Sequence, residues 1–213
     1  MKLFYQIFHT STKGFFHLFY RHRVYGKKHI PQGACIIAPN HASFFDPPLI
    51  AISCDEEVNF LARGSLFNNA LLKKIISNLN SYPVSGSSQD LTSIKLIIQL
   101  LQANKKVVIF PEGKRTTDGH IQPIKPGIGM LMARTECSIV PVYIHGTYDI
   151  WPKSRKFPKL WGKTACVFGS PISWESYKDM PKKQIQQELS LAINKSLSML
   201  QTWYLNGAHG DPP

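Results

Sequence analysis

The chain has 213 residues, the length of one domain with a substantial core, since single domains commonly run to about 100 to 250 residues. Its 25 Lys and Arg against 13 Asp and Glu give a net charge of +12, which favours an anionic partner such as lipid headgroups, nucleic acid or an acidic carrier protein. The four cysteines form no C-x-x-C pair, which argues against a disulfide framework or a zinc site and predicts free thiols in a reducing compartment.

The first predicted element is an amphipathic helical segment over residues 1–30. The first 45 residues hold six basic residues and no acid, interleaved with aromatic residues, a composition typical of a membrane interface. Polar residues at 9–13 interrupt the apolar run, so we expect neither a spanning helix, which needs about 20 mostly apolar residues, nor a secretory signal. The alternative is a helix packed on the core with a solvated basic face.

Residues 31–205 alternate short apolar runs with helical patterns. The apolar runs predict five buried strands, at 34–38, 58–62, 106–110, 139–144 and 164–168. Such alternation indicates the α/β class, with a mostly parallel central sheet flanked by helices on both faces.

Apolar residues at helical spacing predict three helices between and after these strands. The first covers 91–103 behind an N-cap at Asp90, with an inward face made of Leu91, Ile94, Ile97, Ile98 and Leu101. The second covers 127–137 and turns Met130, Leu131 and Ala133 inward. The closing helix is marked by Ile185, Leu189, Ile193, Leu197 and Leu200, and we expect residues 206–213 to form a flexible tail.

Residues 151–163 form a predicted loop rich in charge. This loop has five basic residues, three large aromatic ones and no acid. It is either a second contact with a membrane or an acidic carrier protein, or a plain solvated loop.

The stretch "NHASFFDPPLI" carries the first candidate for chemistry. Pro47 suits the first position of a helix and Asp46 its N-cap, which places His41 and Asp46 where α/β sheets bind their ligands. A carboxylate that accepts from one imidazole nitrogen leaves the other nitrogen free to take a proton from a hydroxyl, so His41 is a candidate general base. The alternative is a capping Asp46 and an ordinary loop histidine. The chain has no G-x-S-x-G or H-E-x-x-H pattern, and we expect no metal site.

The second candidate is "FPEGKRT", residues 110–116, directly after a predicted strand. It delivers Lys114 and Arg115 to the same edge of the sheet as His41, where two cations suit a phosphate. It is not a P-loop, because Val108 stands where a glycine is needed and Arg115 where Ser or Thr is needed. The alternative is a turn with solvated charges.

Together, H-x-x-x-x-D in "NHASFFD", "FPEGKRT" about 70 residues later and "IVPVYIHG" at 139–146 resemble the lysophosphatidate acyltransferase family over roughly residues 35–150. The resemblance implies that His41 deprotonates the sn-2 hydroxyl of a lysophospholipid while Asp46 orients the imidazole. The hydroxyl oxygen then attacks an acyl thioester of coenzyme A or acyl carrier protein directly, and no cofactor beyond this donor is expected.

The resemblance also implies binding residues. The block containing Glu112, Gly113, Lys114, Arg115 and Thr116 is associated with the glycerol phosphate of the acceptor. Arg63 in "FLARGSLF" stands where a lysine is frequent in the family, and Val140 with Pro141 would shape the acyl or acceptor channel. Ser85 and Gly86 follow "YPV" where the family often has an arginine, which leaves the acceptor open.

We therefore expect a membrane-associated enzyme on the cytoplasmic face that makes phosphatidic acid. Its expected partners are a lipid surface, the lysophospholipid acceptor and, as a candidate donor, acyl carrier protein. Backbone N–H groups near Asn40 or at the helix start at Asp46 are candidates for stabilising the oxyanion. The alternatives are an acyltransferase for another lysolipid and a non-catalytic basic lipid-binding module. Nucleic acid is not an expected partner, because no nucleic-acid motif occurs.

Overall fold

A computed structural model describes residues 2–85 and 91–213. Over these residues one sheet is formed in the strand order β1-β7-β6-β2-β5-β3-β4. The strands are β1 (Arg23–Tyr25), β2 (Cys35–Pro39), β3 (Val58–Arg63), β4 (Ser81–Val84), β5 (Lys106–Val108), β6 (Ile139–His145) and β7 (Ala165–Phe168). Neighbouring strands are parallel except for the antiparallel pair β6 and β7. The predicted α/β class with a mostly parallel sheet is confirmed.

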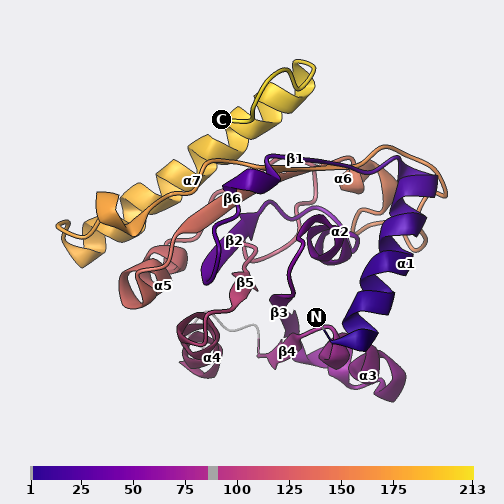
Figure 1. Cartoon of the computed structure of the whole chain (residues 1–213), viewed down its shortest axis with the longest axis horizontal. Helices are drawn as coiled ribbons and strands as arrows, with labels where there is room; N and C mark the ends of the chain where they lie inside the picture. Colours follow the sequence, from indigo (N-terminus) through magenta and orange to yellow (C-terminus); the bar gives the residue numbers. More distant parts are fainter. Residues whose placement is uncertain (1, 86–90) are drawn as a thin grey trace.

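Helices cover both faces of this sheet (Figure 1). One face carries α1 (Leu3–Tyr20) and α2 (Asp46–Ser53), whose side chains share a core with Ile37 of β2. The other carries α4 (Leu91–Gln102), α5 (Gly127–Thr135) and α7 (Lys182–Leu205), which share a core with Ile36. Adjacent residues of β2 serve opposite cores because successive side chains of a strand point to opposite faces.

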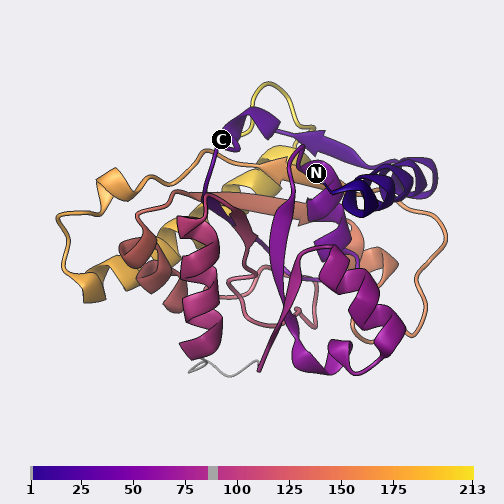
Figure 2. The ribbon, with the colours of Figure 1, turned by 60° about the horizontal axis from the view of Figure 1, so that its bottom comes forward.

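Shorter elements complete the fold at the ends of the strands (Figure 2). They are the helices α3 (Ala70–Asn78) and α6 (Thr147–Ile150) and the 3₁₀ turns η1 (Lys27–His29), η2 (Gly64–Phe67) and η3 (Trp174–Ser176). Within the described ranges, no helix has both the length and the apolar character needed to cross a bilayer.

The five predicted strands are all present, but β1 and β4 were missed. Both are edge strands of only three and four residues, and their side chains are partly exposed. Such strands lack the continuous apolar run by which a buried strand is recognised, and Pro83 in β4 is tolerated because the strand lies at an edge.

Two predicted helix faces are corrected by the structure. In α4, Leu91 is 67% exposed, because the contact with the sheet is made further along the helix, around Ile97 and Leu101. Asp90, its predicted N-cap, lies outside the described residues. In α5, the fully buried residue is Met132, whereas Met130 and Ala133 are only partly buried. The face is turned because Gly129 packs directly on the backbone of α7, where a Cβ atom would lie 2.7 Å from the Cα of Gln186.

Both ends of the described chain belong to the same packed unit. Residues 206–213, predicted to be flexible, fold back on the sheet: the Ser170 N–H donates to the Pro213 carbonyl at 3.0 Å, and Lys28 pairs with Asp211 at 2.6 Å. At the other end, Tyr5, Phe16 and Tyr20 of α1 are buried against the body of the protein. Helix α1 thus packs on the core, and the role of residues 1–30 as a membrane-interface segment stays a prediction.

Candidate active site

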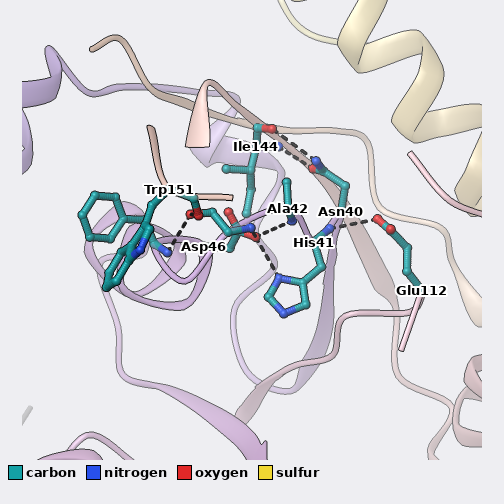
Figure 3. A network of polar contacts seen from close by, with 9 residues as sticks. Asn40, His41, Ala42, Asp46, Glu112, Ile144 and Trp151 are labelled. Atoms are coloured by element: carbon teal, nitrogen blue, oxygen red, sulfur yellow. Dashed lines mark hydrogen bonds and ion pairs between the residues drawn. The ribbon is translucent and has the colours of Figure 1, made fainter. Parts of the chain in front are cut away.

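The exit of strand β2 is fixed by a buried asparagine. The Asn40 side chain donates from Nδ2 to the Ile144 carbonyl at 3.2 Å, and its Oδ1 accepts from the Ile144 N–H at 2.7 Å (Figure 3). This pair of bonds ties the end of β2 to the neighbouring strand β6. The next residue, His41, therefore leaves the sheet at a defined point.

The Asp46 carboxylate organises the loop that follows. Its Oδ2 accepts from His41 Nδ1 at 2.8 Å, from the Ala42 N–H at 2.6 Å and from the Ser43 N–H at 2.7 Å (Figure 3). The carboxylate is fully buried. The predicted N-cap role of Asp46 is wrong, because Asp46 is the first residue of α2 and its bonds run back to the preceding loop. Pro47 and Pro48 follow, and they have no N–H group for a cap to accept.

The imidazole of His41 is held in one orientation. Because a carboxylate only accepts hydrogen bonds, the bond to Asp46 places the proton on Nδ1 and leaves the lone pair on Nε2. The ring stacks on Phe110, with 3.9 Å between the ring centroids, and the side chain is 19% exposed. The bond to Asp46 thus occupies Nδ1, so Nε2 is the ring nitrogen left to take a proton.

The segment 110–116 holds the backbone of His41 from both sides. The Glu112 carboxylate accepts from the His41 N–H at 2.9 Å, and the Thr116 N–H donates to the His41 carbonyl at 2.8 Å. Burial raises the pKa of Glu112 to about 7, against the amides of His41 and Gln122, which lower it. Glu112, assigned from the sequence to the substrate block, therefore lies behind the histidine and supports it.

Arg115 is a cation close enough to Asp46 and Arg63 for their charges to act on it. Its guanidinium lies 3.6 Å above the centroid of the Phe44 ring, and its Nη1 is buried without a hydrogen-bond partner in the described structure. Burial lowers the pKa of Arg115, while nearby Asp46 raises it and nearby Arg63 lowers it further. A buried donor without an acceptor is costly, and an anionic ligand would satisfy it.

The other predicted binding residues are spread around this cation. Arg63 is exposed at the end of β3, Lys114 is exposed, and Gly113 takes a left-handed turn with a φ of 74°. Thr116 is buried, and its hydroxyl donates to Asp118 at 2.6 Å. The structure thus brings Arg115 and Arg63 together and gives Thr116 a place within the loop; contact of these residues with a substrate stays a prediction.

Val140 and Pro141, predicted to shape a channel, lie in the middle of β6. Val140 is fully buried among core residues, and Pro141 is buried beside Ala38. Both are part of the packed sheet in this structure, so contact with an acyl chain stays a prediction.

The expected oxyanion donors near Asn40 are not available. The Asn40 N–H donates to the Val142 carbonyl at 3.3 Å, and the N–H groups of His41, Ala42 and Ser43 are bonded to carboxylates. The Phe45 N–H is also used, since it donates to the Ser43 hydroxyl at 3.1 Å. The expectation that these amides stabilise the oxyanion is therefore wrong, because their N–H groups already hold the loop around His41 and Asp46 in place.

Three further residues of the site were missed by sequence reasoning. They are Phe110, which stacks on the imidazole, Phe44, which lies under Arg115, and Trp151, whose carbonyl accepts from the Ser43 hydroxyl at 2.7 Å. Phe110 and Phe44 lie inside the two motifs, so their aromatic side chains could have been recognised from the sequence as candidate site residues. Trp151 is 108 residues away from Ser43 in the sequence, and no local pattern connects it with the two motifs.

Fold and site together combine an α/β sheet with a hydrogen-bonded histidine and aspartate just beyond the end of the central strand β2. The family model described as Acyltransferase matches residues 21–145, more than half of the sequence. The chain belongs to this acyltransferase family, which confirms the resemblance carried by the two motifs.

Relatives and a solved structure agree with this assignment. The chain is 25% identical over 181 residues to a 1-acyl-sn-glycerol-3-phosphate acyltransferase of Bacillus subtilis, covering 84% of this chain and 87% of that one. It is 23% identical over 180 residues to the chloroplastic 1-acyl-sn-glycerol-3-phosphate acyltransferase BAT2 of Brassica napus, covering 83% of this chain and 52% of that protein, so it spans about half the length of the plant relative. The crystal structure of the 1-acyl-sn-glycerophosphate (LPA) acyltransferase PlsC from Thermotoga maritima superposes with a TM-score of 0.71 at 23% identity, covering 90% of this chain and 78% of that chain, which shows a shared fold.

Proposed function

We propose that the protein transfers a fatty acyl group from an acyl thioester to the sn-2 hydroxyl of lysophosphatidic acid, giving phosphatidic acid. The observation that carries this proposal is the 2.8 Å bond between His41 Nδ1 and a buried Asp46, which leaves Nε2 accessible. The names of the relatives support the choice of acceptor.

The reaction follows from this geometry. His41 Nε2 takes the proton of the acceptor hydroxyl while the oxygen attacks the thioester carbonyl carbon. The C–S bond then breaks, the acyl group stays on the acceptor oxygen, and the departing thiolate takes the proton back from the imidazolium. Asp46 stabilises the imidazolium in between, and a base positioned in this way typically contributes about 10² to 10⁴ in rate.

The acceptor phosphate is proposed to bind at Arg115 and Arg63. The buried, unpartnered Nη1 of Arg115 supports this assignment, since a guanidinium grips a phosphate with two parallel hydrogen bonds. Glu112 acts as a positioning residue through the His41 backbone. Coenzyme A and acyl carrier protein are both retained as candidate carriers of the acyl group.

The protein is further proposed to act at a membrane surface on the cytoplasmic side. The outer face of α1 exposes large apolar residues at helical spacing, namely Leu3, Phe4, Ile7, Phe15 and Leu18. Loop 151–163 exposes Phe157, Leu160 and Trp161 beside it, and Trp161 lies 5.0 Å from Phe19 between ring centroids. An apolar patch with neighbouring lysines suits a bilayer interface. The four free cysteines support a reducing compartment.

The proposal is tested by incubating purified protein with lysophosphatidic acid and either acyl-coenzyme A or acyl carrier protein loaded with the same chain. Release of free thiol and formation of phosphatidic acid are followed together. His41→Ala should lose nearly all turnover and keep its fold, whereas His209→Ala, an exposed histidine of the C-terminal segment, should behave as the unchanged protein.

Equal turnover in the His41→Ala variant and the unchanged protein would refute the proposed mechanism. A lysophospholipid whose phosphate also carries a headgroup, and is therefore a diester, serves as a competing acceptor. If it reacts faster than lysophosphatidic acid, the acceptor assignment fails in favour of another lysolipid. This comparison matters because Ser85 stands where the family often has an arginine.

A further inference from the structure

A second group of cations lies outside the proposed acceptor site. Arg21, Arg23 and Lys163 line a cleft of about 270 Å³ together with Thr164 and Tyr204. These residues come from the end of α1, the start of β1, the segment before β7 and the last turns of α7. Parts of the chain that are distant in sequence therefore bring three positively charged side chains to one cleft.

The cleft lies at the same edge of the sheet as His41. Strand β6 runs parallel to β2, whereas β7 and β1 run in the opposite direction, so the starts of β7 and β1 share an edge with the end of β2. The pairing of His145 with Ala165 and of Ala165 with Arg23 fixes this relation. Strands β1 and β2 are three positions apart in the sheet, roughly 14 Å at the usual strand spacing.

The three cations of the cleft are not neutralised by the protein. No carboxylate lines the cleft, and the ion pairs formed among the described residues involve neither arginine nor Lys163. Arg23 donates a hydrogen bond to the side chain of Tyr25, which raises the pKa of the guanidinium. Like charges held close together repel one another, and a bound dianion would offset that repulsion.

The end of helix α1 sets the position of Arg21. Arg21 ends α1 in the left-handed conformation, with a φ of 44° and a ψ of 42°. Glycine is the usual residue at this position, because a Cβ atom makes the conformation unfavourable. The end of α1 thus places the Arg21 side chain among the residues that line the cleft, at a helix end where a positive charge is also favoured by the helix dipole.

We propose that this cleft binds a phosphate ester other than the phosphate of the acceptor. Two arginines and a lysine match the charge of a phosphate, and each guanidinium offers it parallel hydrogen bonds. The phosphate comes either from the headgroup of an anionic bilayer lipid or from the coenzyme A part of the acyl donor. The second source rests on the proposed function, whereas the first requires no turnover.

The test compares three cleft variants with one control of equal charge change. The variants are Arg21→Gly, Arg23→Gln and Lys163→Gln, and the control is Lys183→Gln at the exposed start of α7. Binding of coenzyme A is measured by calorimetry. Binding to phosphatidylcholine vesicles with and without phosphatidylglycerol is measured by sedimentation. Loss of a hydrogen bond to a charged group typically costs about tenfold or more in affinity, so each cleft variant should fall by that factor for at least one probe.

The probes distinguish the two sources of phosphate. A loss confined to coenzyme A identifies the donor, and a loss confined to the phosphatidylglycerol vesicles identifies the lipid headgroup. Affinities of the three cleft variants equal to that of Lys183→Gln for both probes would overturn the proposal. Arg21→Gly removes the charge while relieving the backbone, so an undiminished melting temperature excludes misfolding as the cause of any loss.

All binding measurements are repeated in His41→Ala. That variant should bind both probes as the unchanged protein does, because the cleft does not contain His41. If His41→Ala turns over normally, the proposed function fails while the cleft proposal still stands on its own binding data.

Discussion

The Glu112 carboxylate accepts a hydrogen bond from the backbone N–H of His41 at 2.9 Å, joining the two sequence motifs across 71 residues. Glu112→Ala should therefore leave the buried N–H of His41 without an acceptor and lower kcat by about tenfold to a hundredfold, since an unsatisfied buried donor costs about 1 to 3 kcal/mol. Glu112→Gln keeps an acceptor oxygen and should retain most activity. A Glu112→Gln variant as inactive as Glu112→Ala would show that the carboxylate itself takes part in the reaction.

Glu112 should also make the free energy of unfolding depend on pH. Burial raises the pKa of Glu112 from 4.5 to about 7 in the folded state, so the folded protein holds its proton more firmly than the unfolded chain. The resulting stabilisation is fully present below pH 4.5 and is lost as the pH rises through 7, with a total of about 3 kcal/mol. Urea unfolding from pH 4.5 to 8 should show the unchanged protein losing stability relative to Glu112→Gln over that window.

His22 is a second source of pH dependence, so the effect of Glu112 is seen only by comparing the unchanged protein with Glu112→Gln. Its ring bridges the hydroxyls of Ser53 and Thr164 at 3.0 Å each, and burial lowers its pKa to about 4. The unfolded chain therefore takes up this proton first, and stability falls as the pH drops from 6.5 towards 4. The two groups oppose each other in the unchanged protein, and a pH-independent difference between it and Glu112→Gln would contradict the assignment to Glu112.

The sequence predicted those parts of the site that are local in the chain. His41 and Asp46 are five residues apart, and the loop at 110–116 follows a strongly apolar strand. Both motifs could therefore be placed at strand ends from the neighbouring residues alone. The bond from Asn40 to Ile144 spans 104 residues and depends on the neighbouring positions of β2 and β6. The grouping of Arg21 with Lys163 depends on the short edge strand β1, which has no clear apolar pattern, and no local signal could reveal it.

Asp46 is predicted to matter through its charge as well as its position. Asp46→Asn keeps a side chain of equal size, but a neutral amide stabilises the imidazolium of His41 poorly and places an NH₂ group among donors. We expect kcat to fall by about 10² to 10⁴ and the free energy of unfolding by about 1 to 3 kcal/mol. Stopped assays and urea unfolding measure the two effects separately. Turnover near that of the unchanged protein would contradict a role for the Asp46 charge in assisting His41.

Arg115 is predicted to act on the acceptor rather than on the donor. Arg115→Ala should raise the KM for lysophosphatidic acid by about tenfold to a hundredfold, because a charged hydrogen bond of about 1.5 to 3 kcal/mol is lost. Arg115→Lys should recover only part of this, since lysine binds phosphate as a point charge and stacks poorly on Phe44. Initial rates with each substrate varied in turn provide the two KM values. A change confined to the thioester would place the donor, not the acceptor, at this guanidinium.

The exposed face of α1 offers a test of the membrane proposal with a matched control. Leu18 of α1 is 67% exposed and Leu191 of α7, on the other side of the sheet, is 66% exposed. Leu18→Gln should weaken sedimentation with phosphatidylcholine vesicles by about tenfold, because burial of a leucine side chain in an apolar phase contributes roughly 1.5 to 3 kcal/mol. Leu191→Gln removes the same apolar surface from a face not expected to touch the bilayer and should bind as before. If both variants bind equally well, the outer face of α1 does not enter the membrane, and the lipid surface must be met by loop 151–163 or by another part of the protein.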